Sequence, residues 1–162
     1  MKKVLNETKQ IVAQLKWLLN GGYAHVTFEN ATAKLPAKYC GVVPDGMPYS
    51  IWQLVEHIHI AQWDILEFSR DPKHKSPEWP KGYWVKETKP ADNKTWSNAL
   101  KQIKSDRKEF TALLEKKDAD IYAPFAWGDG QNLLREALLI ADHNAYHVGE
   151  IIAIRRLLGV WG

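Results

Sequence analysis

One apolar stretch near the C-terminus constrains the fold of this chain more than any other part of it. Residues 133–158 contain neither proline nor a cluster of turn-forming residues, so we predict one unbroken helix over the whole stretch. The polar side of this helix is narrow and consists of Arg135, Asp142, Gly149 and Arg156. A helix that is apolar around most of its circumference must be covered, either by other helices of the chain or by a second subunit.

Two histidines, His143 and His147, lie four residues apart in this predicted helix and therefore on one face of it. Their neighbours on that face are mainly apolar: Glu136, Ile140, Glu150, Ile151 and Ile154. Two imidazoles at this spacing can bind one metal ion, but they can also be neutral core histidines hydrogen-bonded to carbonyls or carboxylates. The glutamate of the zinc-protease motif H-E-x-x-H is missing, because Asn144 occupies its position, so we set a protease aside.

The N-terminal part of the chain predicts one helical arm in two pieces. Residues 3–19 carry apolar side chains at helical spacing, and Asn20-Gly21-Gly22 then stops or kinks the helix. A second, shorter helical pattern follows from Tyr23 to Leu35. Residues 36–48 contain three prolines and two glycines, and they predict a turn-rich loop.

The middle of the chain predicts a long helix and an unusual connection. Ser50 and Gln53 have the spacing of a capping box, which starts a helix that ends near Arg70, before Asp71-Pro72. Residues 71–91 then hold four prolines and the aromatic cluster Trp79, Tyr83 and Trp84. Antiparallel neighbours usually need only about 2–8 residues between them, whereas a connection of about 20 residues can return along the whole helix. We therefore expect the helices on either side of it to run roughly parallel.

A third long helix, from Asp92 or Asn93 to about Lys117, has one apolar side and one lysine-rich side. A loop over residues 123–130, with one proline and two glycines, separates it from the C-terminal helix. Four long helical segments without a convincing strand predict an all-α fold, a four-helix bundle with a long irregular connection between its second and third helices.

Size and charge fit a single domain over residues 1–162, with 45% hydrophobic and 25% charged residues. The net charge of +3 comes from scattered lysines without a long basic run, so we expect no nucleic-acid partner. The first residues lack the apolar core of a secretion signal, and no apolar run is long enough to span a membrane. The single cysteine, Cys40, excludes an internal disulfide framework. We therefore expect a cytoplasmic protein without a membrane partner.

A metal site needs at least three protein ligands, and four further histidines are available to complete the pair. His74 lies among lysines and a proline in the long connection, where we expect it to be solvated. His25 shares the shorter piece of the N-terminal arm with apolar residues and stays a candidate. His57 and His59 fall on opposite edges of an apolar stripe, and helical periodicity alone does not choose between them.

Glu56 and His59 also have the E-x-x-H spacing of di-iron bundles, in which a carboxylate and an imidazole three residues apart share a metal. Such sites need a second copy of the motif. The C-terminal helix offers none, because the residues three positions before its two histidines are Ile140 and Asn144. We therefore set the di-iron interpretation aside.

Several motifs, taken in their order and spacing, resemble the DinB/YfiT-like family of metal-dependent proteins over essentially the whole chain. They are SIWQLVEHI (50–58), AQWDIL (61–66), GDGQNLLREA (128–137), ADHNAYHVGE (141–150) and RRLLG (155–159). The resemblance implies a four-helix bundle in up-down-down-up order, often dimeric, with a divalent metal held by three histidines. Position by position, those metal ligands fall on His57, His143 and His147.

The resemblance also implies a chemistry. Three imidazoles would leave a coordination position open, as in a catalytic zinc site, and they suit zinc or nickel, with iron(II) as a further option. Relatives include S-transferases that use a low-molecular-weight thiol. We therefore expect a metal-dependent thiol S-transferase or hydrolase-type enzyme acting on a small electrophilic substrate held under the aromatic connection. The nearby polar residues receive no catalytic role: Glu56, Asp64, Asp142, Tyr146 and Glu150.

Two alternatives come from other classes. A non-catalytic stress-response or scaffold bundle would use the ion to tie two helices together, and a closed structural zinc site would take Cys40 or His25 as its fourth ligand. The other alternative is a bundle with three core histidines and no metal. In each case the apolar C-terminal helix favours a homodimer.

Overall fold

The computed structural model describes residues 2–162, and it describes side chains from Glu7 onward. Within this range the regular structure is entirely helical, with five α-helices, two short 3₁₀ helices and no strand. The elements are α1 (Lys2–Leu19), α2 (Phe28–Thr32), η1 (Ala37–Tyr39), α3 (Ile51–Arg70), η2 (Lys81–Tyr83), α4 (Asn93–Leu114) and α5 (Leu133–Leu157). The prediction of an all-α protein is confirmed.

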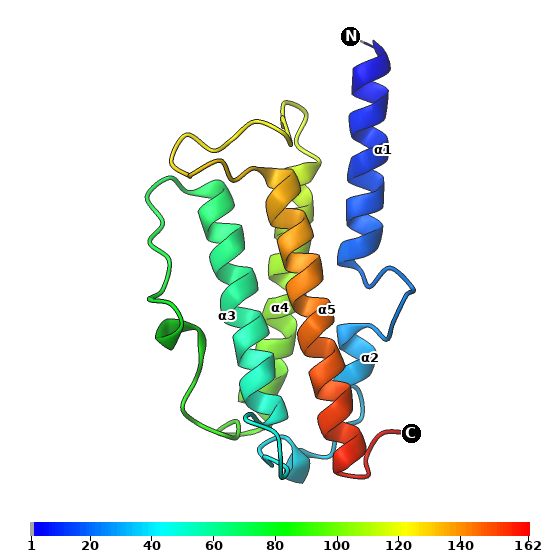
Figure 1. Ribbon diagram of the computed structural model, residues 1–162, viewed down its shortest axis with the longest axis vertical. Coiled ribbons are helices and arrows are strands. Elements are labelled where there is room, and N and C mark those ends of the chain that lie inside the picture. The colour runs from blue at the N-terminus through cyan, green and yellow to red at the C-terminus, as the bar shows by residue number, and fades with distance from the viewer. Residues whose placement is uncertain (1) are drawn as a thin grey trace.

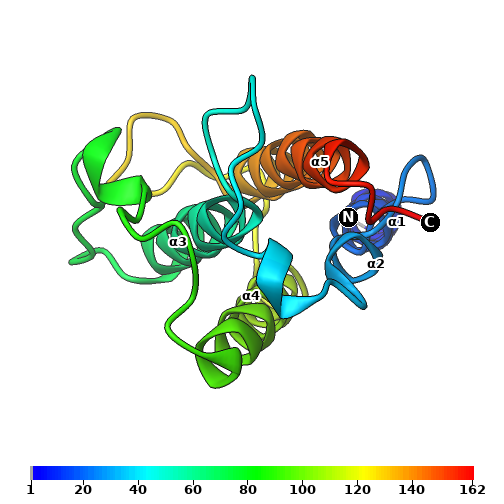
Figure 2. The same ribbon diagram turned by 90° about the horizontal axis from the view of Figure 1, so that it is seen from below.

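The helix α3 packs against both α4 and α5, and α5 also contacts α1 and α2. Figure 1 shows α3 and α4 running in one direction and α1 and α5 running in the other. The view along the helices in Figure 2 places α1 and α2 beside α5, on the side away from α3. Residues 71–92 pass along the outer side of α3 and return the chain to the end where α3 began (Figure 1).

The helix starts follow the capping signals in the sequence. The Ser50 hydroxyl accepts a hydrogen bond from the Gln53 backbone N–H, and the Gln53 side chain accepts one from the Ser50 N–H, which confirms the predicted capping box. The Asp92 side chain caps α4 by accepting a hydrogen bond from the backbone N–H of Thr95. The C-terminal helix starts at Leu133 as predicted, whereas α4 ends at Leu114, three residues earlier than expected.

The prediction of a helix from Tyr23 to Leu35 is wrong at both ends. Only Phe28–Thr32 is helical, and the Thr27 side chain caps its start. Tyr23 has a φ of 57° and Lys34 a φ of 51°, which are left-handed values that a right-handed helix excludes. The helical spacing of apolar residues in this segment therefore reflects burial of a short turn against α5, which it contacts, and not a continuous helix.

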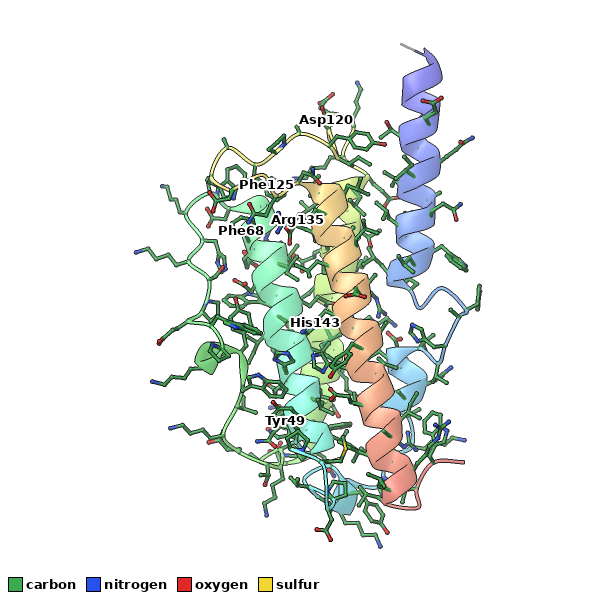
Figure 3. All side chains as sticks on the ribbon, in the orientation of Figure 1. Tyr49, Phe68, Asp120, Phe125, Arg135 and His143 are labelled. Atoms are coloured by element: carbon green, nitrogen blue, oxygen red, sulfur yellow. The ribbon has the colours of Figure 1, made fainter. Side chains whose placement is uncertain are left out.

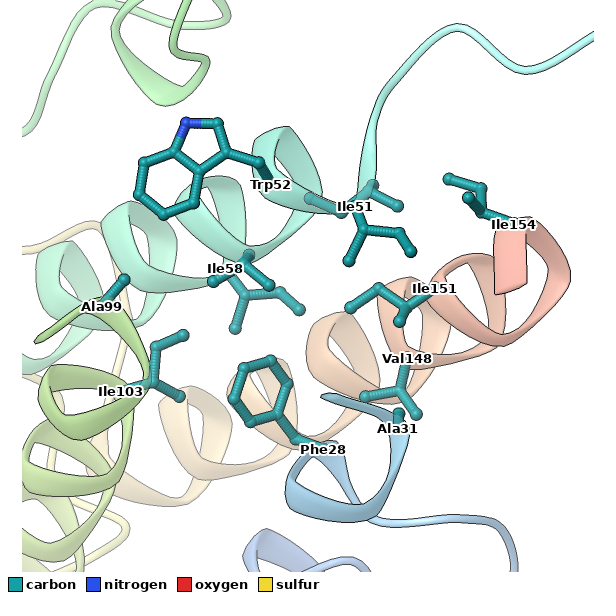
Figure 4. Packing of buried hydrophobic residues seen from close by; sticks show 12 residues of the cluster. Phe28, Ala31, Ile51, Trp52, Ile58, Ala99, Ile103, Val148, Ile151 and Ile154 are labelled. Atoms are coloured by element: carbon teal, nitrogen blue, oxygen red, sulfur yellow. The ribbon is translucent and has the colours of Figure 1, made fainter. Parts of the chain in front are cut away.

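The buried apolar side chains form two clusters, one toward each end of the bundle. The first cluster lies between the start of α3 and the end of α5 and includes Ile51, Ile58 and Ile151 (Figure 4). The second includes Phe110 of α4 and Ile140 of α5, together with residues of α1 and α3. Burial of these two clusters supplies the main driving force for folding of the bundle.

A layer of polar side chains separates the two clusters. On α3, α4 and α5, residues Gln62, Asp106 and Asn144 each stand between first-cluster and second-cluster positions. The Gln62 amide donates to the Ile103 carbonyl (2.6 Å) and accepts from the Asn144 side chain (2.9 Å), so it links all three helices. Asp106 Oδ1 accepts a hydrogen bond from the Gln102 side chain (2.7 Å), whereas its buried Oδ2 has no hydrogen-bond partner among the described residues. The layer adjoins His143, which directly precedes Asn144 on α5.

Candidate metal centre

Three histidines converge between α3 and α5. His57 comes from α3, and His143 and His147 come from consecutive turns of α5. One ring nitrogen of each lies within 4.8 Å of the other two, and no other such group of histidine, cysteine or carboxylate ligands occurs among the described side chains. Figure 3 shows His143 between the two helices. The structure thus brings together the three residues that the sequence pointed to.

Two of these imidazoles are held by partners on the side away from the cluster. The Nδ1 atom of His57 lies 2.9 Å from the Tyr83 carbonyl oxygen, and the Nδ1 of His147 lies 2.7 Å from Glu150 Oε2. A carbonyl or carboxylate oxygen can only accept, so each Nδ1 carries the proton and each Nε2 presents a lone pair. This is the outer-partner arrangement that orients metal-binding histidines.

The third imidazole completes the set. His143 Nε2 lies 3.1 Å from His57 Nε2, and its Nδ1 faces the Asn144 side-chain oxygen at 3.5 Å. Two nitrogens bound to one tetrahedral zinc ion at bonds of about 2.05 Å stand about 3.3 Å apart, so the observed separation fits ligation. Nitrogen lone pairs facing each other at this distance repel unless a proton or a cation lies between them. The residues present therefore fit a divalent metal ion.

The electrostatics of the cluster favour the neutral, metal-binding form of each ring. Burial and, to a smaller extent, the neighbouring imidazoles of His147 and His57 together lower the pKa of His143 to about 4. Burial and the charge of His57 lower the pKa of His147 to about 4. Burial also lowers the pKa of His57, although the Tyr83 carbonyl and Glu150 oppose the shift. All three rings are therefore neutral near pH 7, which is the state that binds a metal.

Aromatic rings cover one side of the cluster. The Trp84 indole stacks on the His57 ring, with centroids 3.9 Å apart, and Tyr49 stacks on the other face of Trp84 at 3.8 Å. Tyr146 lies against His147 and is 65% exposed. Trp79, by contrast, is 71% exposed and contacts Tyr83 instead of the histidines. Two of the three aromatic residues noted in the connection thus contribute to the site.

The remaining histidines and the cysteine lie outside the cluster. His59 stands near Glu56, with a nitrogen–oxygen distance of 3.6 Å. His25 is exposed, and its Nδ1 lies 2.8 Å from the Val26 carbonyl oxygen. Cys40 is buried, and burial raises the pKa of its thiol. Neither Cys40 nor His25 joins the three histidines, so the fourth ligand of a closed zinc site is not formed among the described side chains.

The expectation that His74 is solvated is wrong. Its side chain is only 10% exposed, and its Nε2 lies 2.7 Å from Asp64 Oδ1. The other oxygen of Asp64 accepts a hydrogen bond from the Tyr83 hydroxyl at 2.6 Å. Asp64 is also buried, and its spacing of seven residues from His57 places both on one face of α3. The position of the Asp64 carboxylate, seven residues after His57 on a largely apolar face, was the only feature of the sequence that could have indicated its contact with His74.

Lowering the pH from about 6.5 to about 4 should destabilise the metal-free protein by several degrees in melting temperature. In the unfolded chain a histidine titrates near 6.5, whereas His143 and His147 in the folded chain have a pKa of about 4. Within this window the unfolded state binds protons that the folded state does not, so stability falls as the pH falls. Thermal unfolding in the presence of a chelator measures the effect.

The matched control for this pH dependence is the double variant His143→Leu/His147→Leu, which removes both titrating rings. Its melting temperature should change less than that of the wild type between pH 6.5 and 4. Equal pH slopes for the two proteins would show that these histidines do not titrate with lowered pKa values.

Fold and site together define an all-helical protein with a buried three-histidine cluster. The model of the DinB superfamily matches residues 24–151, and the chain belongs to that superfamily. The family inferred from the sequence motifs is thereby confirmed. No curated protein and no solved structure matches the chain. Within residues 2–162 no helix has the length and apolar character needed to cross a membrane.

Proposed function

We propose that this protein binds one divalent metal ion through His57, His143 and His147. The observation that carries this proposal is the convergence of three neutral imidazoles, two of which have their Nδ1 protons committed to outside acceptors. A set of three imidazole nitrogens suits zinc or nickel, and iron(II) is the third option. With no fourth protein ligand among the described side chains, at least one coordination position would face a substrate or water.

We further propose that the protein is a metal-dependent thiol S-transferase, or a hydrolase-type enzyme, acting on a small electrophilic substrate. A bound ion would supply Lewis acidity, which lowers the pKa of a thiol or of water. The chain's own residues hold and shield the ligands. The Tyr83 carbonyl and Glu150 keep protons on the outer nitrogens, and the stacked Trp84 and Tyr49 exclude water from one face of His57.

A transfer assay tests this activity. Purified protein loaded with zinc, nickel or iron(II) is incubated with common bacterial low-molecular-weight thiols and with chlorinated aromatic or epoxide acceptors. With a chlorinated aromatic acceptor, a carbon–sulfur bond forms while chloride leaves, and the thiol proton passes to solvent. With an epoxide acceptor, a carbon–sulfur bond forms while the ring carbon–oxygen bond breaks, and the proton ends on the opened epoxide oxygen. Metal-dependent thioether formation that is lost in His143→Ala supports the proposal. If no thioether forms with any combination of metal, thiol and acceptor, the proposed transferase activity is contradicted.

A second candidate function is a non-catalytic stress-response or scaffold bundle in which the ion ties α3 to α5. The burial of His57 and His147, which are 2% and 7% exposed, favours this role because buried ligands restrict access to the ion. In that case the loaded protein would melt at a higher temperature than the metal-free protein but would transfer no thiol.

We also propose the architecture and assembly typical of the family. The helix directions in Figure 1 support a four-helix bundle of α1, α3, α4 and α5 in up-down-down-up order, forming a single domain over residues 1–162. Large apolar side chains are exposed on α1 and α5: Trp17, Leu18, Leu138, Leu139 and Leu157. They support a homodimer in which a second copy covers this surface. We place the protein in the cytoplasm.

A further inference from the structure

The connection of residues 71–92, here called the strap, is fastened along α3 by a series of hydrogen bonds. The His74 side chain of the strap bonds to Asp64 of α3 at 2.7 Å. In four further bonds, main-chain oxygens of the strap accept from the side chains of α3 and of its N-cap, and the Tyr83 side chain donates to α3. The bonds are Tyr83 hydroxyl to Asp64 (2.6 Å), His57 to the Tyr83 carbonyl (2.9 Å), Gln53 to the Val85 carbonyl (3.2 Å) and Ser50 to the Thr88 carbonyl (2.5 Å). The strap therefore runs antiparallel to α3 and is hydrogen-bonded along it, and His57 of the candidate metal centre makes one of these bonds.

Two consecutive residues of the strap hold the His57 ring in two directions. The Tyr83 carbonyl fixes the ring at its Nδ1 edge, and the Trp84 indole lies flat on its face, with only 5° between the two planes. The direction in which His57 Nε2 points, toward His143, thus depends on where the strap backbone lies at these two residues. A displacement of this backbone would move a ligand of the metal centre.

The position of that backbone depends in turn on the Tyr83 side chain. Its hydroxyl donates to Asp64, a carboxylate that is 8% exposed and whose other oxygen is held by His74. Asp64 and His57 lie two turns apart on one face of α3, so Tyr83 spans both turns, with its hydroxyl on one and its carbonyl on the other. Burial and the Asp64 carboxylate raise the pKa of Tyr83 well above its usual range, which keeps the hydroxyl a donor.

We propose that Asp64 and Tyr83 are positioning residues of the metal centre: the Asp64–Tyr83 hydrogen bond locks the strap, and the strap orients the His57 ring toward the other two histidines. The inference rests on the metal binding proposed above and extends it to residues that touch no metal. By thermodynamic linkage, a strap that orients the ligand must itself be ordered by the bound ion.

The Tyr83→Phe substitution tests this directly because it removes only the hydroxyl and keeps the carbonyl that His57 needs. We expect zinc affinity, measured by competition with a chelating dye, to fall about tenfold, the size of effect typical of outer partners of metal ligands. Tyr23→Phe is the matched control, since Tyr23 is 91% exposed, and its affinity should equal that of the wild type.

Substitutions of Asp64 supply an independent arm. Asp64→Ala should weaken zinc binding at least as much as Tyr83→Phe, because it removes the bond to the Tyr83 hydroxyl and also the bond to His74. The double variant should bind no more weakly than Asp64→Ala, because the Tyr83–Asp64 bond is already absent from that single variant. Asp64→Asn retains an oxygen that can accept from the Tyr83 hydroxyl, and it should keep most of the affinity.

A second readout follows the strap itself. Zinc should slow tryptic cleavage at the exposed Lys81 and Lys86 in the wild type, and this protection should be largely lost in Tyr83→Phe. Tyr83→Phe that binds zinc as tightly as the wild type, even with a lowered melting temperature, would overturn the positioning role and leave the metal proposal intact. A wild-type protein that binds no metal would overturn both.

Discussion

Replacing His57, His143 or His147 singly by alanine should abolish stable metal binding. The wild type should carry about one equivalent of zinc or nickel per chain, and each variant should lose more than about 100-fold in affinity. Two imidazoles are too few to hold a divalent ion in this site, because the structure offers no fourth protein ligand among the described side chains. The metal content of freshly purified protein, measured by plasma mass spectrometry, gives the result.

The matched control for this experiment is His25→Ala. His25 is exposed and outside the cluster, so its removal should leave the metal content unchanged. A wild type that is empty when purified, and stays empty after incubation with zinc, nickel and iron(II), would make the three histidines core residues. Loss of metal from His25→Ala as well would indicate binding elsewhere on the chain.

The three ligands are predictable from the sequence to different degrees. The helical period places His143 and His147 on one face, and this follows from the backbone geometry of a single element. The choice of His57 over His59 did not follow from periodicity, since both flank the same apolar stripe. It needed the family resemblance, because which edge of α3 faces α5 is decided by packing between helices and not by either helix alone.

The outer partners of the ligands could not be predicted for a related reason. Glu150 lies three residues after His147 on the same helix, so its contact was within reach of local spacing. The Tyr83 carbonyl contacts His57 and the Tyr83 hydroxyl contacts Asp64. Tyr83 belongs to an irregular segment, whose path has no period from which such contacts can be derived. The prediction that His74 is solvated is wrong for the same reason. Its polar sequence neighbours indicated exposure to solvent, but the strap folds back onto α3 and buries the His74 side chain against Asp64.

The polar layer explains why this core is divided. Gln62 and Asn144 bond to each other across α3 and α5, and Asn144 adjoins His143, so the amides lie beside the site. If the residues of this layer were apolar, the core would be continuous, but His143 Nδ1 would lose its polar neighbour Asn144. Most of the apolar burial is consequently placed in the two clusters on either side of the layer. Each cluster then has to be sufficiently well packed to stabilise the bundle.

Phe110→Ala tests this division and should cost about 3–5 kcal/mol in the free energy of unfolding. Phe110 is the largest fully buried side chain, and it belongs to the second cluster, with Leu66 of α3 and Ile140 of α5. Removal of the ring deprives the folded state of the free energy gained by transferring the ring from water to the core. It also leaves a cavity that the three surrounding helices cannot close without distortion. Denaturant unfolding in the presence of a chelator measures the loss.

Val43→Ala serves as the comparison, because Val43 is 40% exposed and is not among the residues of the proposed dimer surface, so its truncation should change stability by less than about 0.5 kcal/mol. Because the polar layer separates Phe110 from the histidines, the folded fraction of Phe110→Ala should still bind zinc with wild-type affinity. A loss below about 1 kcal/mol would mean that the second cluster repacks around the missing ring. Weaker zinc binding by the folded variant would instead mean that the second cluster sets the position of α5, and with it the ligands His143 and His147.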